Sequence, residues 1–156
     1  MIHLARSVLL GMVASGDASK TVARKGCWRT MKKTKGQLEA EISEAIIKFE
    51  KEYMGRGPDE TQTYILDDMV LVRLRGVLTP AEKQLAGAGD GTRGRALIKQ
   101  VRMELLEKGR MLLEPVIRDI CGRNVKSLHT DISTVTGERI IIFALDGYPD
   151  FERKKN

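Results

Sequence analysis

Apolar residues recur at helical spacing in the first patterned stretch of the chain. They stand three or four positions apart and would line one face of an α-helix; they are Leu38, Ile42, Ala45, Ile46, Phe49 and Tyr53. Thr34 and Gln37 have the spacing of a capping box at its start, and Gly55, Gly57 and Pro58 are stop signals at its end. The pattern predicts a helix over residues 35–54.

A β-hairpin is predicted directly after this helix. Residues 61–66 and 69–74 are rich in β-branched and aromatic residues and flank Asp67-Asp68, a pair of acidic turn formers. The second run is more uniformly apolar than the first, so it is expected to be the inner strand of the two.

Two further helices are predicted in the middle of the chain. Thr79-Pro80-Ala81-Glu82 combines a threonine cap, proline at the first helical position and glutamate at the third, so a short helix begins there. After the glycine-rich stretch 87–94, a long helix runs to Gly122; the apolar residues expected on its inner face are Leu97, Ile98, Val101, Leu105, Leu112, Val116, Ile117 and Ile120. Pro115 is expected to kink or divide this helix near Leu113.

A second hairpin is predicted over residues 124–134 and 139–145, with Gly137 suited to a positive φ in the turn. Its run Ile140-Ile141-Ile142-Phe143 is apolar on both faces, which is typical of a central, covered strand. Helices on one side of the sheet would leave either Ile140 and Ile142 or Ile141 and Phe143 uncovered. The uncovered pair predicts a homodimer or a docking face for a protein partner, unless the segment after Pro115 folds over that face.

The order of these elements is helix, hairpin, helices, hairpin. It predicts an α+β fold in which a four-stranded antiparallel sheet carries helices packed on one face. Gly55-Arg56 and Gly122-Arg123 each end a predicted helix just before a hairpin, which raises the hypothesis of a duplicated αββ unit. The expected organisation is a basic, mostly disordered leader over residues 1–30, a single domain over 31–146 and a polar tail over 147–156.

The net charge of +6 is concentrated in the leader. Residues 1–30 hold five basic residues and one acidic residue, whereas the remaining chain holds 22 basic and 20 acidic residues. A domain that binds nucleic acid usually gathers lysine and arginine on one face and stacks bases on aromatic side chains, which make up only 4% of this chain. No nucleic acid is therefore expected as a partner, although a weak nucleic-acid-binding module stays as an alternative.

Membrane insertion and cysteine chemistry are not expected either. The apolar stretch from Leu4 to Ala14 is interrupted by Arg6 and Gly11 and is shorter than the roughly 20 residues that a transmembrane helix needs. Cys27 and Cys121 have neither disulfide nor metal-site spacing, and Cys121 is expected to be a buried small hydrophobe.

One candidate polar site lies on the second hairpin. His129 and Asp131 stand two positions apart on a predicted strand, so both side chains leave the same face. With Glu138 or Arg139 across the turn they would form a polar cluster that can orient a base or a metal ligand. The alternative is a solvated or hydrogen-bonded strand face. Since no nucleophile has a forced position nearby, no catalytic, cofactor-binding or metal-ligating residue is assigned, and the chain is not expected to be an enzyme.

A second candidate is an anion-binding loop. Gly89-Asp90-Gly91-Thr92-Arg93-Gly94 matches the Gly-x-Gly-x-x-Gly pattern of dinucleotide sites. That chemistry needs a strand before the loop, and here a helix precedes it, so a flexible inter-helix loop is favoured. Gly91, Arg93 and Arg95 could still hold an anion at the start of the long helix. An anion or small-molecule sensor is therefore kept as an alternative function.

Four separated strings resemble the MpsC family, in order along the chain from about Met31 to Asp146. They are Gly55-Arg56-Gly57-Pro58, Ile65-Leu66-Asp67-Asp68-Met69, Gly76-Val77-Leu78-Thr79-Pro80-Ala81-Glu82-Lys83, and Leu128-His129-Thr130-Asp131-Ile132-Ser133 with Thr136-Gly137-Glu138-Arg139. The family takes its name from a sodium-translocating, membrane-potential-generating system.

The resemblance implies a non-catalytic accessory subunit of a sodium or inorganic-carbon translocating system. Such a subunit would be cytoplasmic, at the inner face of the membrane, and its partner subunits would perform the transport. The family supplies no catalytic or ligand-binding residues that can be carried over to this sequence, so the resemblance predicts a role and no site.

Overall fold

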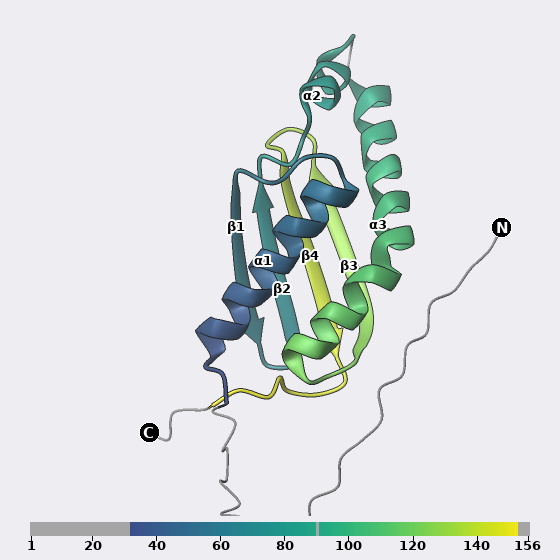
Figure 1. The fold of residues 1–156 in the computed structure, drawn as a ribbon. Coiled ribbons are helices and arrows are strands. Elements are labelled where there is room, and N and C mark those ends of the chain that lie inside the picture. Colours follow the sequence, from purple (N-terminus) through teal and green to yellow (C-terminus); the bar gives the residue numbers. More distant parts are fainter. Residues whose placement is uncertain (1–31, 90, 153–156) are drawn as a thin grey trace, which may run out of the picture. The chain divides into compact units, whose positions relative to one another are not determined.

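The computed structural model describes residues 32–89 and 91–152, and the expectations for the leader over 1–30 lie outside these residues. Its elements, in chain order, are α1 (Lys35–Tyr53), β1 (Glu60–Leu66), β2 (Met69–Arg75), α2 (Pro80–Gly87), α3 (Thr92–Cys121), β3 (Val125–Ser133) and β4 (Glu138–Leu145). This order confirms the predicted α+β class, with helices and hairpins alternating along the chain (Figure 1).

The four strands form one antiparallel sheet in the order β1-β2-β4-β3. The two strands predicted to be inner, β2 and β4, are its central strands, and they pair with Val72 opposite Ile141. Both hairpin turns use left-handed backbone: Asp67 has φ 54° in the first and Gly137 has φ 70° in the second. The acidic and glycine turn signals of the sequence therefore mark the two hairpins correctly.

Both predicted capping boxes are present. The side chain of Thr34 accepts from the backbone N–H of Gln37 at the start of α1, and that of Thr79 accepts from Glu82 at the start of α2. Each of these third-position side chains in turn accepts from the N–H of its capping threonine. Because these contacts satisfy N–H groups that have no partner within the helix, they fix where each helix begins.

Pro115 does not divide the long helix α3, so of the two predicted effects, a kink or a division, the division is wrong. The helix runs without a break from Thr92 to Cys121 and changes direction along its length (Figure 1). Proline removes one backbone hydrogen bond, but Leu113 and Ile117 on either side of it are buried in the core, and this packing holds both halves of the helix to the sheet. The segment after Pro115 therefore stays on the same side of the sheet as the rest of α3.

The buried face of α3 also differs from the predicted one. It consists of Gly94, Ile98, Arg102, Leu106, Gly109, Leu113, Ile117 and Cys121. Leu97, Val101, Leu112 and Val116, which were expected inside, are 39–57% exposed. Of the predicted residues, Ile98 and Ile117 are buried and Ile120 packs partly buried against the core. Periodicity therefore finds part of the buried face and extends it onto a neighbouring stripe, because the buried stripe also holds Arg102 and two glycines. Cys121 is buried as predicted.

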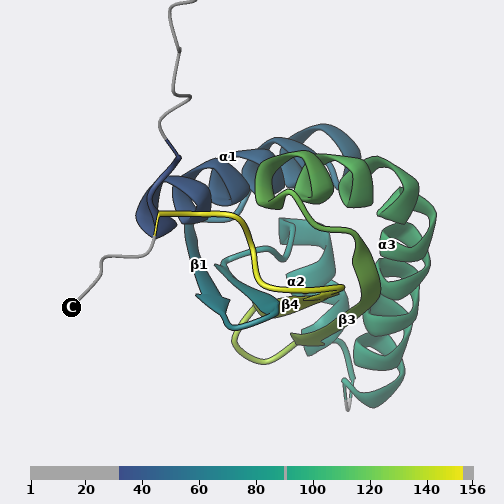
Figure 2. The same cartoon turned by 90° about the horizontal axis from the view of Figure 1, so that it is seen from below.

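The core lies between the sheet and the helices. Alternate residues of the central strands point toward α1 and α3, among them Val70 and Val72 of β2 and Ile141 and Phe143 of β4. Ile140 and Ile142 point to the opposite face, where they are only partly buried. Figure 2, which looks along the strands, shows α1 and α3 on one side of the sheet. No described element covers the other side, which we call the open face.

The expected tail is bonded to the domain as far as the structure describes it. The backbone N–H of Asp150 donates to the carbonyl of Cys121 at 3.0 Å, and that of Glu152 donates to the carbonyl of Lys33 at 2.9 Å. Phe151 packs against the core. Residues 147–152 therefore tie the end of β4 to the start of α1 and the end of α3.

Candidate functional site

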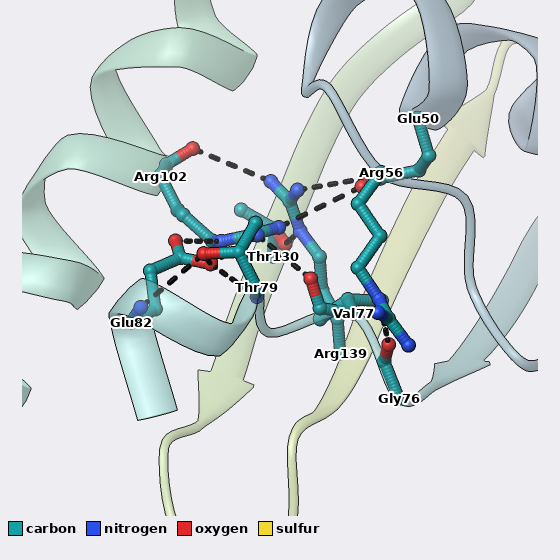
Figure 3. Close-up of polar contacts among 9 residues, drawn as sticks. All are labelled: Glu50, Arg56, Gly76, Val77, Thr79, Glu82, Arg102, Thr130 and Arg139. Atoms are coloured by element: carbon teal, nitrogen blue, oxygen red, sulfur yellow. Dashed lines mark hydrogen bonds and ion pairs between the residues drawn. The ribbon is translucent and has the colours of Figure 1, made fainter. Parts of the chain in front are cut away.

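The largest concentration of polar contacts in the described residues is a buried ion network between the helices and β4 (Figure 3). We call it the ion network; its four charged members are Glu50, Glu82, Arg102 and Arg139. They come from α1, α2, α3 and β4 respectively, so the network joins every layer of the domain. Its two carboxylates and two guanidinium groups give the network a formal net charge of zero.

Arg139 projects from β4 toward the helices and is 1% exposed. Its Nη1 donates to Glu50 Oε1 at 2.9 Å, its Nε to Thr130 Oγ1 at 3.2 Å and its Nη2 to the backbone carbonyl of Arg102 at 3.4 Å. The alternation of β4 places Arg139 on the same face as Ile141 and Phe143, in a position that a hydrophobic residue usually occupies.

Arg102 is the centre of the network and is 3% exposed. Its Nε and Nη2 bind the two oxygens of Glu82 at 2.7 Å each, and Nη2 also donates to the carbonyl of Val77 at 2.7 Å. This two-pronged geometry is the strongest form of an arginine–carboxylate pair. Glu82 also accepts from the backbone N–H and the hydroxyl of Thr79, so the residue that caps α2 is at the same time the ion partner of α3.

Glu50 completes the network from the end of α1, and no part of it is exposed. Its Oε2 lies 3.7 Å from Arg102 Nη1, and neither of these two atoms has a hydrogen-bond partner. The contact is therefore an ion pair without a hydrogen bond, in contrast to the direct contact of Glu50 with Arg139. Glu50 is the least well satisfied of the four charged groups.

The titration of these groups reflects their burial. Burial raises the pKa of Glu50 above its usual value, although the charges of Arg139 and Arg102 act against it. Burial also acts to raise the pKa of Glu82, but hydrogen bonds from Arg102 and Thr79 outweigh it and the net pKa is lowered. Burial lowers the pKa of Arg139. The network is an internal set of charges that satisfy one another, and its direct effect is to fix the helices on the sheet.

The loops beside the network are held by a second set of contacts. Arg56 donates from Nε to the carbonyl of Gly76 at 3.1 Å and from Nη2 to Asp59 at 2.9 Å. Gly76 has φ 68°, and a Cβ there would lie 1.9 Å from Asp59 Oδ2, so only glycine fits. The N–H of Val77 donates to the carbonyl of Gly137. The segments that contain Arg56, Gly76 and Gly137 are distant in the sequence and thus meet at one end of the sheet.

The polar cluster predicted from His129, Asp131, Glu138 and Arg139 is not assembled. His129 and Asp131 share the open face, as predicted, but Arg139 lies on the helix side of the sheet. Each of the other three has its own neighbour: His129 lies 3.1 Å from Ser127 Oγ, Asp131 pairs with Lys99 at 2.9 Å, and Glu138 pairs with Arg73 at 2.7 Å. Within residues 32–89 and 91–152, no group of histidine, cysteine and acidic side chains could hold a metal ion.

The glycine-rich loop is shaped by the packing of α2 on α3. Gly91 caps α3 with φ 70°, and a Cβ on it would lie 2.6 Å from the carbonyl oxygen of Ala86. A Cβ on Gly94 would lie 2.1 Å from the carbonyl of Leu85. Arg95 donates toward the carbonyl of Ala86 at 3.4 Å, whereas Arg93 is exposed. The structure brings Gly91 and Arg95 together, and the glycines permit close helix contact.

Three members of the ion network were missed in the sequence as site residues, although a signal for them exists. Glu50 stands four residues after the buried Ile46 of α1, and Arg102 stands four residues after Ile98 and four before Leu106 of α3. A charged residue at a core position of each of two helices, with opposite signs, indicates a buried pair. Glu82 was identified in the sequence only as a capping residue.

Comparison with known proteins gives a family match over nearly the whole described domain. The sequence model of the family described as "Na+-translocating membrane potential-generating system (MpsC)" matches residues 34–147. A Bacillus subtilis (strain 168) protein named "Uncharacterized protein YbcI" is 49% identical over 115 residues, which cover 74% of this chain and 90% of the relative. No solved structure matches the chain. No helix within the described residues is long and apolar enough to cross a membrane.

Proposed function

Because this chain belongs to the MpsC family, we propose that it is a non-catalytic accessory component of a Na+-translocating, membrane-potential-generating system. In this proposal the chain is cytoplasmic and acts at the inner face of the membrane, while partner subunits move sodium, or sodium with inorganic carbon. It contributes by binding a protein, either a second copy of itself or another subunit of the system.

The observation that carries the binding role is the open face of the sheet. Tyr64, Leu66 and Met69 project from it and are 44%, 47% and 41% exposed. Leu71 and Ile142 lie beside them on the two central strands and are partly buried. A contiguous apolar surface of this kind on a sheet that no described element covers is typical of a protein–protein interface.

The ion network supports the same proposal from the other side of the sheet. It fastens α1, α2 and α3 to β4 through buried charged contacts, so the helix layer is fixed to the sheet. A rigid sheet presents its open face in one shape, and a preformed surface loses less conformational entropy on binding than a mobile one.

The role in the system is tested in the native host. The gene is deleted, and the Na+-dependent membrane potential is followed with a potential-sensitive dye in cells that carry no copy, the wild-type copy or an Ile142→Lys copy. We expect deletion to change the response to added sodium and the wild-type copy to restore it, because the accessory component acts on that system. An unchanged response after deletion would contradict the proposed function.

The Ile142→Lys copy tests the docking face within the same experiment. It places a charge in the apolar part of the open face and should fail to restore the response. Leu112→Lys is the matched control, because it changes an apolar residue of similar size on the outward surface of α3, where it is 57% exposed. This control should restore the response as well as the wild-type copy does.

A further inference from the structure

We propose that the open face binds a second copy of the same chain, stacked face to face about a two-fold axis that runs parallel to the strands. Strand β2 of each copy then lies over β4 of the other, and β1 lies over β3. The inference rests on the open face being a docking face, as proposed above, and adds the identity of the partner and the geometry of the pair.

The side chains of the open face form rows across the sheet that change character from one end to the other. The strand pairing defines three of the rows. They are Leu66, Met69, Ala144 and Ser127; then Tyr64, Leu71, Ile142 and His129; then Gln62, Arg73, Ile140 and Asp131. Beyond the third row lie Glu60, Arg75 and Glu138, which form ion pairs with one another. The face is therefore apolar at the end near Asp67 and charged at the other end.

This gradient selects the direction of the two-fold axis. An axis perpendicular to the strands, in the plane between the sheets, would place the apolar rows of one copy on the charged rows of the other. Such a contact would bury charged groups without partners, which is costly. An axis parallel to the strands places like rows on like rows, so that apolar residues meet apolar residues. Sheets that pack face to face also keep their strands nearly aligned, within about 30°.

The charges of the open face are complementary under the same axis. The charged end of β2 carries Arg73 and Arg75, and the charged end of β4 carries Glu138. Since the axis exchanges the positions of β2 and β4, Arg75 of each copy lies across from the partner's Glu138, and Arg73 lies one row away from it. The intrachain pair of Arg73 with Glu138 at 2.7 Å then extends into a network that joins both copies. Opposite charges steer and orient an encounter more than they add to its affinity.

The size of the face predicts a dimer of modest affinity. Four strands spaced by about 4.8 Å and seven residues long at about 3.4 Å per residue give a flat footprint of roughly 450 Å² per copy. Stable complexes usually bury about 800 Å² on each partner, and smaller interfaces belong to weaker complexes. The pair should therefore dissociate on dilution, which makes its association measurable by sedimentation equilibrium.

The first test measures self-association of the full chain. We expect the wild type to shift from monomer to dimer with rising concentration, up to about 100 μM. Ile142→Lys and the more exposed Met69→Lys should each weaken association at least tenfold, since both lie in apolar rows that face their counterparts. Leu112→Lys on α3 should leave association unchanged. Circular dichroism of each variant confirms that it is folded, and Met69→Lys keeps the test valid if Ile142→Lys does not fold.

Two outcomes of this test would overturn the inference. One is a wild-type chain that stays monomeric at about 100 μM, a concentration at which even a weak dimer would be populated. The other is a dimer that Leu112→Lys dissociates while Met69→Lys does not, because the exposed stripe of α3 would then be the interface. Neither result depends on the sodium response of the deletion strain, which tests the proposed function separately. The dimer can therefore be refuted while the proposed function stands, and the reverse.

The second test measures the direction of the axis by cross-linking. Tyr64→Cys and His129→Cys are made separately in a chain that also carries Cys27→Ser, and a short thiol cross-linker is applied. The proposed axis places β1 over the partner's β3, so a mixture of the two variants should form covalent dimers and Tyr64→Cys alone should form few. Efficient self-linking of Tyr64→Cys alone would place β1 over β1 and refute the parallel axis.

Discussion

The most informative perturbation of the fold is Arg102→Met, which removes the central cation of the ion network. Methionine fills much of the space of the arginine stem but donates no hydrogen bonds. The three contacts of Arg102 at 2.7 Å are lost, two to Glu82 and one to the carbonyl of Val77. Glu50 keeps its contact with Arg139 but loses the ion pair that faces its other oxygen.

The expected loss of unfolding free energy depends on which former partners of Arg102 can be solvated in the variant. Glu82 is 21% exposed at its side chain and keeps its two contacts with Thr79, so part of its loss is recovered by solvation. Glu50 and the carbonyl of Val77 are buried and cannot be solvated without opening the core. Removing one partner from a buried ion pair costs about 3–5 kcal/mol. Since domains of this size are stable by about 5–15 kcal/mol, the variant should lose a large part of its stability.

The assay is urea denaturation of the full chain followed by circular dichroism, with Arg110→Met as the matched control. Arg110 pairs with Glu114 on the surface of the same helix, where both side chains are about one third exposed. A surface pair of this kind contributes at most about 0.5 kcal/mol. A loss below about 1 kcal/mol for Arg102→Met, similar to that of the control, would show that the network contributes little and would refute this reasoning.

Four further outcomes are expected. The folded-state pKa of Glu82 lies below its ordinary 4.5, so the stability that Glu82 contributes is present above about pH 4.5 and is lost as pH falls. A Glu82→Gln variant should therefore lose less unfolding free energy than the wild type between about pH 5 and pH 3. An equal slope of unfolding free energy against pH in the two proteins would contradict this. Gly94→Ala should cost about 1–3 kcal/mol in urea denaturation, since its Cβ would meet the backbone of Leu85. Gly36→Ala, which meets nothing within 4 Å, should instead stabilise α1 by up to about 1 kcal/mol. In a Cys27→Ser chain, Cys121 should react with a thiol reagent only after denaturation, because burial raises its pKa to about 11; rapid reaction of the folded chain would show that the helix end is open.

The sequence alone determined the elements and their order, because local chemistry sets them. Thr34 with Gln37 and Thr79 with Glu82 satisfy the free N–H groups of a helix start from within four residues. Asp67 and Gly137 adopt positive φ in the two hairpin turns, as residues of these types often do. The uniformly apolar runs of β2 and β4 indicated the central strands of the sheet correctly. Only one face of each strand is covered by helices, and Ile140 and Ile142 lie partly buried on the open face.

Which stripe of α3 is buried was decided only by the tertiary structure. Leu97, Val101, Leu112 and Val116 have the same helical spacing as the stripe that is buried. Hydrophobic periodicity ranks them higher than a stripe that contains an arginine and two glycines. Gly109 is inside because a Cβ there would lie 2.5 Å from the ring of Phe49, so α1 and α3 approach closely at that point. Arg102 is inside because carboxylates from two other helices meet it.

The candidate site was likewise beyond local inference. Glu50 and Arg139 are 89 positions apart in the chain and become partners only when α1 packs on β4. The alternation of β4 put Arg139 on the helix side, away from His129 and Asp131, although the three are close in sequence. Local chemistry determines which residues favour a helix, a strand or a turn. Which buried charges find a partner depends on the packing of distant segments, since a charge is stable in the core only where an opposite charge from another element arrives beside it.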